Sequence, residues 1–294
     1  MNKIKTIFST KYTANTPTAS MRKLEPVARA AEKCGFSELV EPNDCNIESK
    51  LRELHNPEFV DAFVAGLEPM ASDQGFDWSP KVRDGVLEIN KGQLTAAEIA
   101  LTEGVAANVA QGFHHAGYEG GAAFCTFNGL ALVAQEHPDK KIFVLDCDAH
   151  GGNGTEEFIL RGDLPNLRQI TINGGAFGCG AGEKSVSVTL KNVDHDFEPY
   201  RNALELSLEL IDDWKPDLVI YQAGADPHKD DPFGGMGMTA PQMRERDRIV
   251  FEALKERGIP VMFVLAGGYQ TPIETKLMPL HLATFEEAAE VFCD

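Results

Sequence analysis

Short apolar runs rich in valine and isoleucine recur along the chain between longer amphipathic stretches. Several of these runs are apolar at every position, which is typical of strands that helices cover on both faces of a sheet. The predicted strands are Ile4–Phe8, Ile142–Asp146, Gln169–Ile172, Val186–Leu190, Leu218–Gln222 and Val261–Leu265.

The stretches between the strands carry apolar residues at helical spacing. The predicted helices are Met21–Cys34, Pro57–Gly66, Gln93–Ala110, Phe197–Trp214 and Ala240–Arg257, together with a segment that starts at Asn128. Alternating strands and helices predict an α/β fold with a doubly wound, mostly parallel sheet flanked by helices. Because no repeat, low-complexity tract or linker interrupts the chain, we expect a single domain over residues 1–294. In such a sheet, ligands bind beyond the carboxyl ends of the strands.

Composition and charge then exclude several classes of protein. The net charge of −18 argues against binding nucleic acid through its phosphates. It is compatible with a cationic substrate, although solubility alone explains many acidic proteins. No apolar run approaches the roughly 20 residues that cross a bilayer, so we expect no membrane association. The apolar stretch at the N-terminus is too short for a secretion signal, and we expect a cytoplasmic location with six reduced cysteines.

The end of one predicted strand carries an unusual polar cluster. Asp146, Asp148 and His150 alternate there, and side chains two apart in extended backbone share a face. Such a cluster of anions needs a cation, and carboxylate oxygens with an imidazole nitrogen suit zinc or iron(II). Asp226 follows another strand and is the candidate third ligand. Three protein ligands leave a position open for water, as in catalytic metal sites. The alternative is that Asp148 and His150 only cap the next helix.

Two further stretches offer groups for catalysis. His114 and His115 lie in a loop flanked by glycines. They are either a pair of surface histidines or general acid–base groups, one taking a proton from metal-bound water and one protonating a leaving amine. Tyr269 follows two glycines, where its hydroxyl could donate to a developing oxyanion, although an ordinary turn also explains this motif.

Taken together and in this order, these stretches resemble the histone deacetylase family within the arginase/deacetylase fold. The resemblance spans most of the chain. It extends to the segments Thr16–Lys23, His55–Val60 and Phe124–Leu130, the last of which matches an F-C-x-x-N motif of the family. The GGNGT turn after His150 and the chain length are more similar to bacterial and class II- or IV-like members than to class I nuclear enzymes.

The resemblance implies a zinc-dependent amide hydrolase that removes acetyl or other short acyl groups from amines. Its substrate would be an acylated amine, either a peptidyl acetyl-lysine or a small molecule such as an acetylated polyamine. The resemblance implies metal ligation by Asp148, His150 and Asp226, with iron(II) as an alternative to zinc in the cell. Nothing in the sequence indicates an oligomeric state.

The resemblance also assigns roles around the metal. His115 would be the general base and acid with Asn153 as its hydrogen-bond partner, and His114 would hold a proton with Asp146 behind it. Tyr269 would polarise the acyl carbonyl. The substrate channel would be lined by Phe124, Phe177 and Gly268.

Three positions depart from the family pattern. Gly151 stands where a second His or a Gln usually follows the ligand histidine, but that residue is not a ligand. Ala123 stands where a Gly commonly precedes the Phe-Cys pair, which would narrow the channel mouth. Asn173 stands roughly where a Ser usually serves a structural potassium ion, which makes a K⁺ site doubtful, although Asp146 and backbone carbonyls could still hold one.

Two other functions stay open. An arginase-like ureohydrolase would bind two manganese ions and need further carboxylates, but Gly152 occupies the position where one is expected. A catalytically silent family member would bind an acylated ligand without hydrolysing it. Asp230 and Asp231 could contact substrate, but we expect them in a solvated loop.

Overall fold

Eight parallel strands form one sheet in the computed structural model, which describes residues 3–180 and 182–293. Their order across the sheet is β2-β1-β3-β8-β7-β4-β5-β6. The strands are β1 Ile4–Ile7, β2 Ser37–Val40, β3 Val105–Asn108, β4 Ile142–Asp146, β5 Leu167–Asn173, β6 Ser185–Thr189, β7 Leu218–Gln222 and β8 Val261–Val264. All neighbouring strands pair in parallel, so the predicted α/β fold is confirmed.

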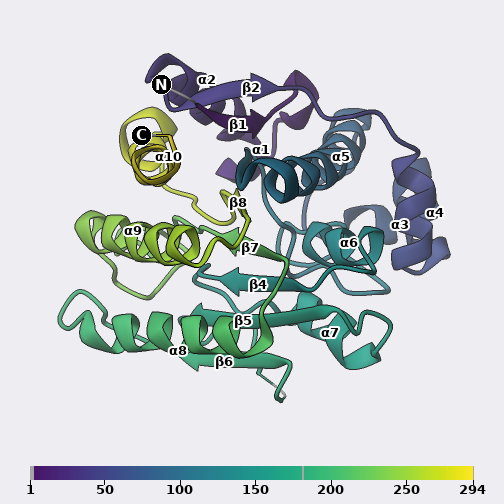
Figure 1. Ribbon diagram of the computed structural model, residues 1–294. Coiled ribbons are helices and arrows are strands. Elements are labelled where there is room, and N and C mark those ends of the chain that lie inside the picture. Colours follow the sequence, from purple (N-terminus) through teal and green to yellow (C-terminus); the bar gives the residue numbers. More distant parts are fainter. Residues whose placement is uncertain (1–2, 181, 294) are drawn as a thin grey trace.

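Helices cover both faces of the sheet, as Figure 1 shows. Helices α2, α8, α9 and α10 lie on one face, and α5, α6 and α7 lie on the other, with α3 and α4 outside them. The helices are α1 Ala19–Arg22, α2 Leu24–Lys33, α3 Ile47–Leu54, α4 Pro57–Ala65, α5 Pro80–Glu103, α6 Gly129–Glu136, α7 Asn153–Arg161, α8 Glu198–Trp214, α9 Ala240–Arg257 and α10 Met278–Phe292, with the short turns η1 Thr10–Tyr12, η2 Met70–Ser72 and η3 Ile273–Leu277. No helix among the described residues is long and apolar enough to span a membrane.

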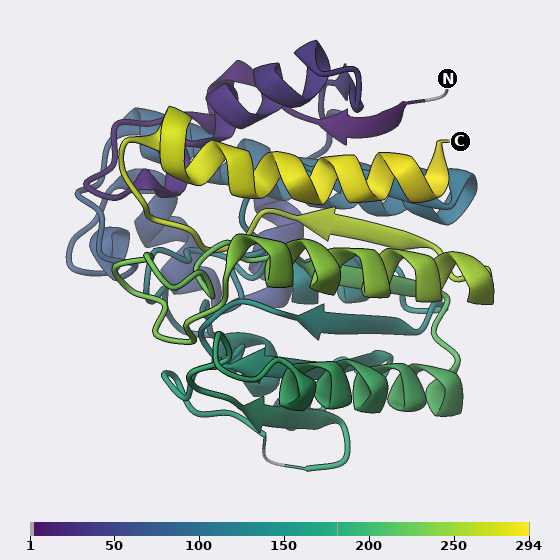
Figure 2. The ribbon, with the colours of Figure 1, turned by 90° about the vertical axis from the view of Figure 1, so that its left-hand side faces the viewer.

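The central strands form the core, because β4, β7 and β8 are buried at every position. This explains their continuous apolar runs, since helices cover both of their faces. Parallel strands end at one edge of the sheet. In Figure 2 the arrowheads point toward the left-hand side, where the loops that follow the strands gather. The polar motifs that follow β4, β7 and β8 therefore meet at that edge.

The six predicted strands are all observed, with bounds that differ by no more than two positions. The helix predicted over Gln93–Ala110 is wrong at both ends. Ser79 caps α5 by accepting from the backbone N–H of Val82, so this helix starts much earlier in the chain. It ends at Gly104, whose φ of 92° is left-handed.

The residues after Gly104 form strand β3 instead of a continued helix. The helix predicted over Met21–Cys34 is also corrected, because it divides at Lys23 into α1 and α2. Strands β2 and β3 and helices α3, α7 and α10 were not predicted from the sequence. Neither strand has the valine- and isoleucine-rich run that marks the predicted strands, because β2 reads SELV and β3 reads VAAN.

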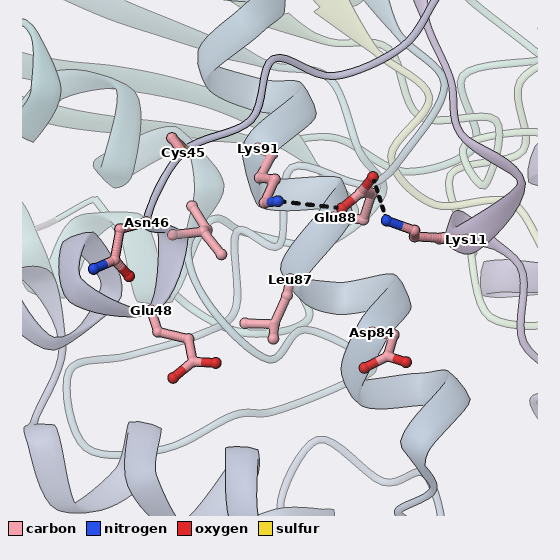
Figure 3. Close-up of a pocket in the computed structure, with 9 residues that line it drawn as sticks. Lys11, Cys45, Asn46, Glu48, Asp84, Leu87, Glu88 and Lys91 are labelled. Carbon is pink, nitrogen blue, oxygen red and sulfur yellow. Dashed lines mark hydrogen bonds and ion pairs between the residues drawn. The ribbon is translucent and has the colours of Figure 1, made fainter.

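A surface hollow of about 290 Å³ opens between η1, α3 and α5 (Figure 3). Three of its charged side chains pair with one another: Glu88 lies 3.4 Å from the Nζ of Lys11 and 3.7 Å from the Nζ of Lys91. The other two carboxylates of the lining, those of Glu48 and Asp84, pair with Arg52 and Arg83. Among the residues that the structure describes, the hollow shares none of its lining with the site at the carboxyl ends of the strands.

Candidate metal centre and active site

Three predicted metal ligands meet at the carboxyl ends of two paired strands. Asp148 and His150 follow β4, and Asp226 follows β7, which lies beside β4 in the sheet. The Nδ1 of His150 is 3.0 Å from Asp148 Oδ1 and 3.0 Å from Asp226 Oδ2. One ligand atom from each residue lies within 4.8 Å of the others. The structure therefore brings together the three side chains that the sequence singled out.

Hydrogen bonds orient each of these side chains. The Nε2 of His150 is 3.1 Å from the carbonyl oxygen of Phe233, and donation there leaves Nδ1 free to face the carboxylates. The backbone N–H of Gly267 donates to Asp148 Oδ2 at 2.7 Å, and that of Ala149 donates to Asp226 Oδ1 at 3.1 Å. Each carboxylate thus keeps one oxygen directed at the imidazole.

The electrostatics of the cluster fit a divalent cation. Burial, followed by the charge of Asp148, raises the pKa of Asp226 to about 7. Burial opposes a charged His150, but its bonds to the two aspartates raise its pKa to about 11. A protonated His150 would neutralise part of the carboxylate charge. Two carboxylates and one imidazole are a donor set that zinc accepts, and a divalent ion would replace that proton.

The two histidines of the Gly-flanked loop lie against each other, with ring centroids 3.9 Å apart. His114 Nδ1 is 2.7 Å from Asp146 Oδ2, and His115 Nδ1 is 2.6 Å from Asn153 Oδ1. Burial opposes a charge on His114, yet the carboxylates of Asp146 and Asp148 raise its pKa. Burial and the neighbouring His114 lower the pKa of His115 well below 6.5. The pair therefore divides into one histidine that favours a proton and one that stays neutral.

The loop that carries Tyr269 is held by two contacts that the sequence analysis did not anticipate. The buried ammonium of Lys23 donates to three successive carbonyls, at 2.6 Å to Ala266, 3.0 Å to Gly267 and 3.4 Å to Gly268. Burial lowers the pKa of Lys23 to about 8, against the charges of nearby aspartates. A lysine that binds backbone carbonyls leaves no motif of its own, so the sequence placed Lys23 only at the end of the segment Thr16–Lys23 and gave it no role.

The second contact corrects an expectation. Asp231 does not lie in a solvated loop: it is only 8% exposed, and its Oδ2 accepts the backbone N–H of Tyr269 at 2.8 Å. The loop after β7 folds back onto the loop after β8, which buries this carboxylate. Asp230 is exposed, as expected.

Aromatic rings surround the approach to the cluster. Phe124 lies 5.6 Å from the ring of Tyr269, and Phe177 lies 4.2 Å from the ring of His115. Phe233, which the sequence analysis missed, lies 5.0 Å from Tyr269 and is 51% exposed. Phe177 is 44% exposed. These rings place apolar surface beside both the phenol and the histidine pair.

Packing explains why position 268, which was predicted to contact substrate, is occupied by glycine. Its φ is 130°, and a Cβ there would lie 2.8 Å from Leu277 and 3.0 Å from Ala225. A side chain is also excluded at Gly151, because its Cβ would lie 2.2 Å from the carbonyl oxygen of Phe177. This close contact accounts for the departure from the family pattern at that position.

Asn173, which also departs from the family pattern, forms hydrogen bonds with nearby residues through its side chain. Its Nδ2 donates to Ser187 at 2.9 Å, and its Oδ1 accepts the backbone N–H of Gly175 at 2.8 Å. The amide thus serves the turn after β5. The weakening of a potassium site by this asparagine remains a prediction.

Comparison with known proteins gives the family. The model of the histone deacetylase domain matches residues 17–285. An uncharacterized protein of Picosynechococcus is 33% identical over 251 residues, which cover 82% of each chain. Acetylpolyamine amidohydrolase of Mycoplana ramosa is 29% identical over 173 residues, covering 54% of this chain and 50% of that protein. A crystal structure of acetylpolyamine aminohydrolase from Burkholderia pseudomallei shares the fold, with a TM-score of 0.79 at 19% identity over 98% of this chain and 99% of that one.

Proposed function

The chain belongs to the histone deacetylase family, and we propose that it removes acetyl or other short acyl groups from amines with zinc held by Asp148, His150 and Asp226. Family membership makes it a deacetylase that hydrolyses amide bonds. The proposal adds the metal, the catalytic residues and the size of the acyl group. The observation that carries it is the convergence of three ligands with the histidine pair at one edge of the sheet.

The metal would occupy the space between the three ligand atoms. When bound, zinc supplies Lewis acidity, which polarises an acyl carbonyl and makes water more acidic. Iron(II) accepts the same donor set, so metal content is part of the test.

We assign the role of general base to His115. Its Nδ1 faces Asn153 Oδ1, so Nδ1 carries the proton and Nε2 is free to accept one. Its lowered pKa keeps the ring neutral and ready for this step. His115 would take a proton from the attacking water and pass it to the amine nitrogen that leaves. His114, held by Asp146, would keep its proton and stabilise negative charge beside the metal.

Tyr269 would stabilise the oxyanion. Burial raises the pKa of Tyr269 well above 10, and the charges of Asp148 and Asp226 add to this. The phenol thus stays protonated and can donate to an oxygen that gains negative charge during attack. The negative charges of Asp148 and Asp226 thus favour the protonated phenol, which can donate a hydrogen bond, over the phenolate.

The decisive experiment measures metal content and amine release on the same protein. Acetyl-lysine peptides and acetylated polyamines are offered to wild type, Asp226→Ala and Asp230→Ala. We expect about one equivalent of zinc and amine release in wild type, both lost in Asp226→Ala. Asp230→Ala is the matched control, because it removes an exposed carboxylate of the same loop and should change neither.

Other outcomes decide between alternatives. Two equivalents of manganese without amide hydrolysis would favour a binuclear ureohydrolase. One equivalent of zinc with no release from any acyl amide would favour a protein that only binds acylated ligands. Either result would reject the proposed reaction.

A further inference from the structure

A small inner cavity lies beside the proposed catalytic groups. His114, Asp148 and Tyr269 form part of its wall, and Gln111 and Gln222 form another part. It leaves about 10 Å³ for the centre of a water molecule, which is room for about one such molecule. Because the wall includes the proposed oxyanion donor and a metal ligand, the acyl end of a bound amide would point into this cavity.

The two glutamines place buried side-chain amides in the wall of this cavity. Gln111 is 6% exposed and Gln222 is 1% exposed. Within residues 3–180 and 182–293, neither Oε1 nor Nε2 of Gln111 has a hydrogen-bond partner, and neither has Oε1 of Gln222. Buried polar groups are nearly always paired with protein, water or ligand. These three atoms therefore need a polar partner.

The surrounding contacts position the amide of Gln222 and the backbone of Gln111. The Nε2 of Gln222 lies 3.4 Å from Asp146 Oδ2. A Cβ at Gly112 would lie only 2.2 Å from Gln222 Oε1, so this glycine leaves space for the amide oxygen. The backbone carbonyl of Gln111 accepts a hydrogen bond from Gln93 Nε2 at 2.8 Å. Neither amide is a flexible surface group.

Resting on the proposed function, we propose that Gln111 and Gln222 form a polar subsite for the end of the acyl group. The subsite favours an acyl group that carries one hydroxyl, such as hydroxyacetyl, over propionyl, which has the same number of non-hydrogen atoms. A hydroxyl can both donate to an amide oxygen and accept from an amide nitrogen, whereas a methyl group leaves both unpaired. An acetyl group would leave the same space to one water molecule.

The test compares two substrates of equal size in one peptide. Values of kcat/KM for hydroxyacetyl-lysine and propionyl-lysine are measured with zinc-loaded wild type, Gln111→Met and Gln135→Met. We expect wild type to favour hydroxyacetyl by about tenfold, as one hydrogen bond allows, and Gln111→Met to bring the ratio close to one. Gln135→Met is the control, because the amide of Gln135, on α6, donates to the backbone carbonyl of Lys50, on α3, outside the cavity, and the variant should keep the wild-type ratio.

The ratio separates the subsite from a general loss of activity. An unchanged ratio in Gln111→Met, or a wild type that prefers propionyl, would overturn the proposal. Melting curves check that Gln111→Met folds, and Gln111→Ala gives a second variant without the amide.

A failure of the proposed function can be distinguished from a failure of the proposed subsite. If no acyl amide is hydrolysed, the reaction is rejected, and the subsite is tested by calorimetry with hydroxyacetate and propionate on zinc-loaded protein. Tighter binding of hydroxyacetate that Gln111→Met abolishes would support the subsite. Equal effects of the substitution on both anions would overturn it.

Discussion

At the scale of single residues, Tyr269 offers the most direct test of the proposed mechanism. Replacing it with Phe removes one hydroxyl and leaves the aromatic contacts with Phe124 and Phe233 in place. We expect kcat to fall about 100-fold, or roughly 3 kcal/mol, because an oxyanion donor is lost. Steady-state kinetics on an acetylated substrate measure this, with zinc content as the control. Wild-type turnover by a zinc-loaded Tyr269→Phe variant would remove the role assigned to the phenol.

Lys23 is a candidate positioning residue for the same phenol. An ammonium has three donor hydrogens, and here they meet three successive carbonyls, those of Ala266, Gly267 and Gly268. The residue that follows them is Tyr269. The ammonium also lies 5.9 Å from the centre of the Tyr269 ring. Lys23 thus fixes the backbone from which the phenol projects.

Substituting Lys23 with Met should therefore act through Tyr269. We expect kcat to fall about 10- to 100-fold, as small displacements of catalytic groups do, with a smaller change in KM. A double-mutant cycle distinguishes positioning from a general loss of structure. In a Tyr269→Phe background, Lys23→Met should cost much less. Equal losses in both backgrounds would contradict the positioning role, and Lys11→Met, at an exposed lysine, is the control.

Some site residues could be predicted from the sequence and others could not, because the first follow from a local pattern and the second from contacts between distant parts of the chain. Asp146, Asp148 and His150 alternate on a strand end, so their convergence followed from strand geometry. Lys23 contacts Ala266, 243 positions away along the chain, and nothing in the local pattern predicts that contact. The same holds for the amide of Gln111, whose importance appears only when the cavity is seen.

At the scale of secondary-structure elements, the site depends on which strands are neighbours. Asp146 of β4 pairs in register with Gln222 of β7, which places Asp148 and Asp226 beyond adjacent strand ends. The sequence predicted both strands and their polar ends. It did not predict their adjacency, because the order of strands in a parallel sheet depends on how the helices pack across its faces.

Helix α9 ties the two loops together through Arg246. Its buried guanidinium donates from Nη1 to the carbonyls of Gly224, at 2.8 Å, and Cys147, at 3.3 Å, and from Nε to Asp247 at 2.8 Å. Asp247 also accepts from Tyr221 on β7. One side chain of α9 therefore links the segments that follow β4 and β7.

We expect Arg246→Met to lower the free energy of unfolding by about 3–5 kcal/mol, because it leaves Asp247 buried without its ion pair. Urea denaturation measures the loss. Arg257→Met on the same helix removes a pair with Asp212 that is partly exposed, and should cost less than about 1 kcal/mol. Similar values for the two variants would show that Arg246 does not join the loops as described.

At the scale of the whole molecule, negative charge dominates. The chain has 45 acidic against 27 basic residues, for a net charge of −18. Most of this charge can be solvated, but Asp148 and Asp226 are buried within the same cluster. Their repulsion is relieved in part by His150. A bound divalent cation would relieve it further, so folding and metal binding should be coupled.

Metal binding should thus stabilise the entire domain. At a zinc concentration 1,000 times the Kd, linkage predicts about 4 kcal/mol of added stability, which corresponds to a rise in Tm of roughly 7 °C for a chain of this size. Calorimetry of chelator-treated and zinc-loaded protein measures the shift. Asp226→Ala should abolish it by removing a ligand, whereas Asp230→Ala, whose carboxylate is exposed, should retain it. A zinc-dependent shift that survives in Asp226→Ala would place the ion elsewhere, because the stabilisation would no longer depend on the cluster between β4 and β7.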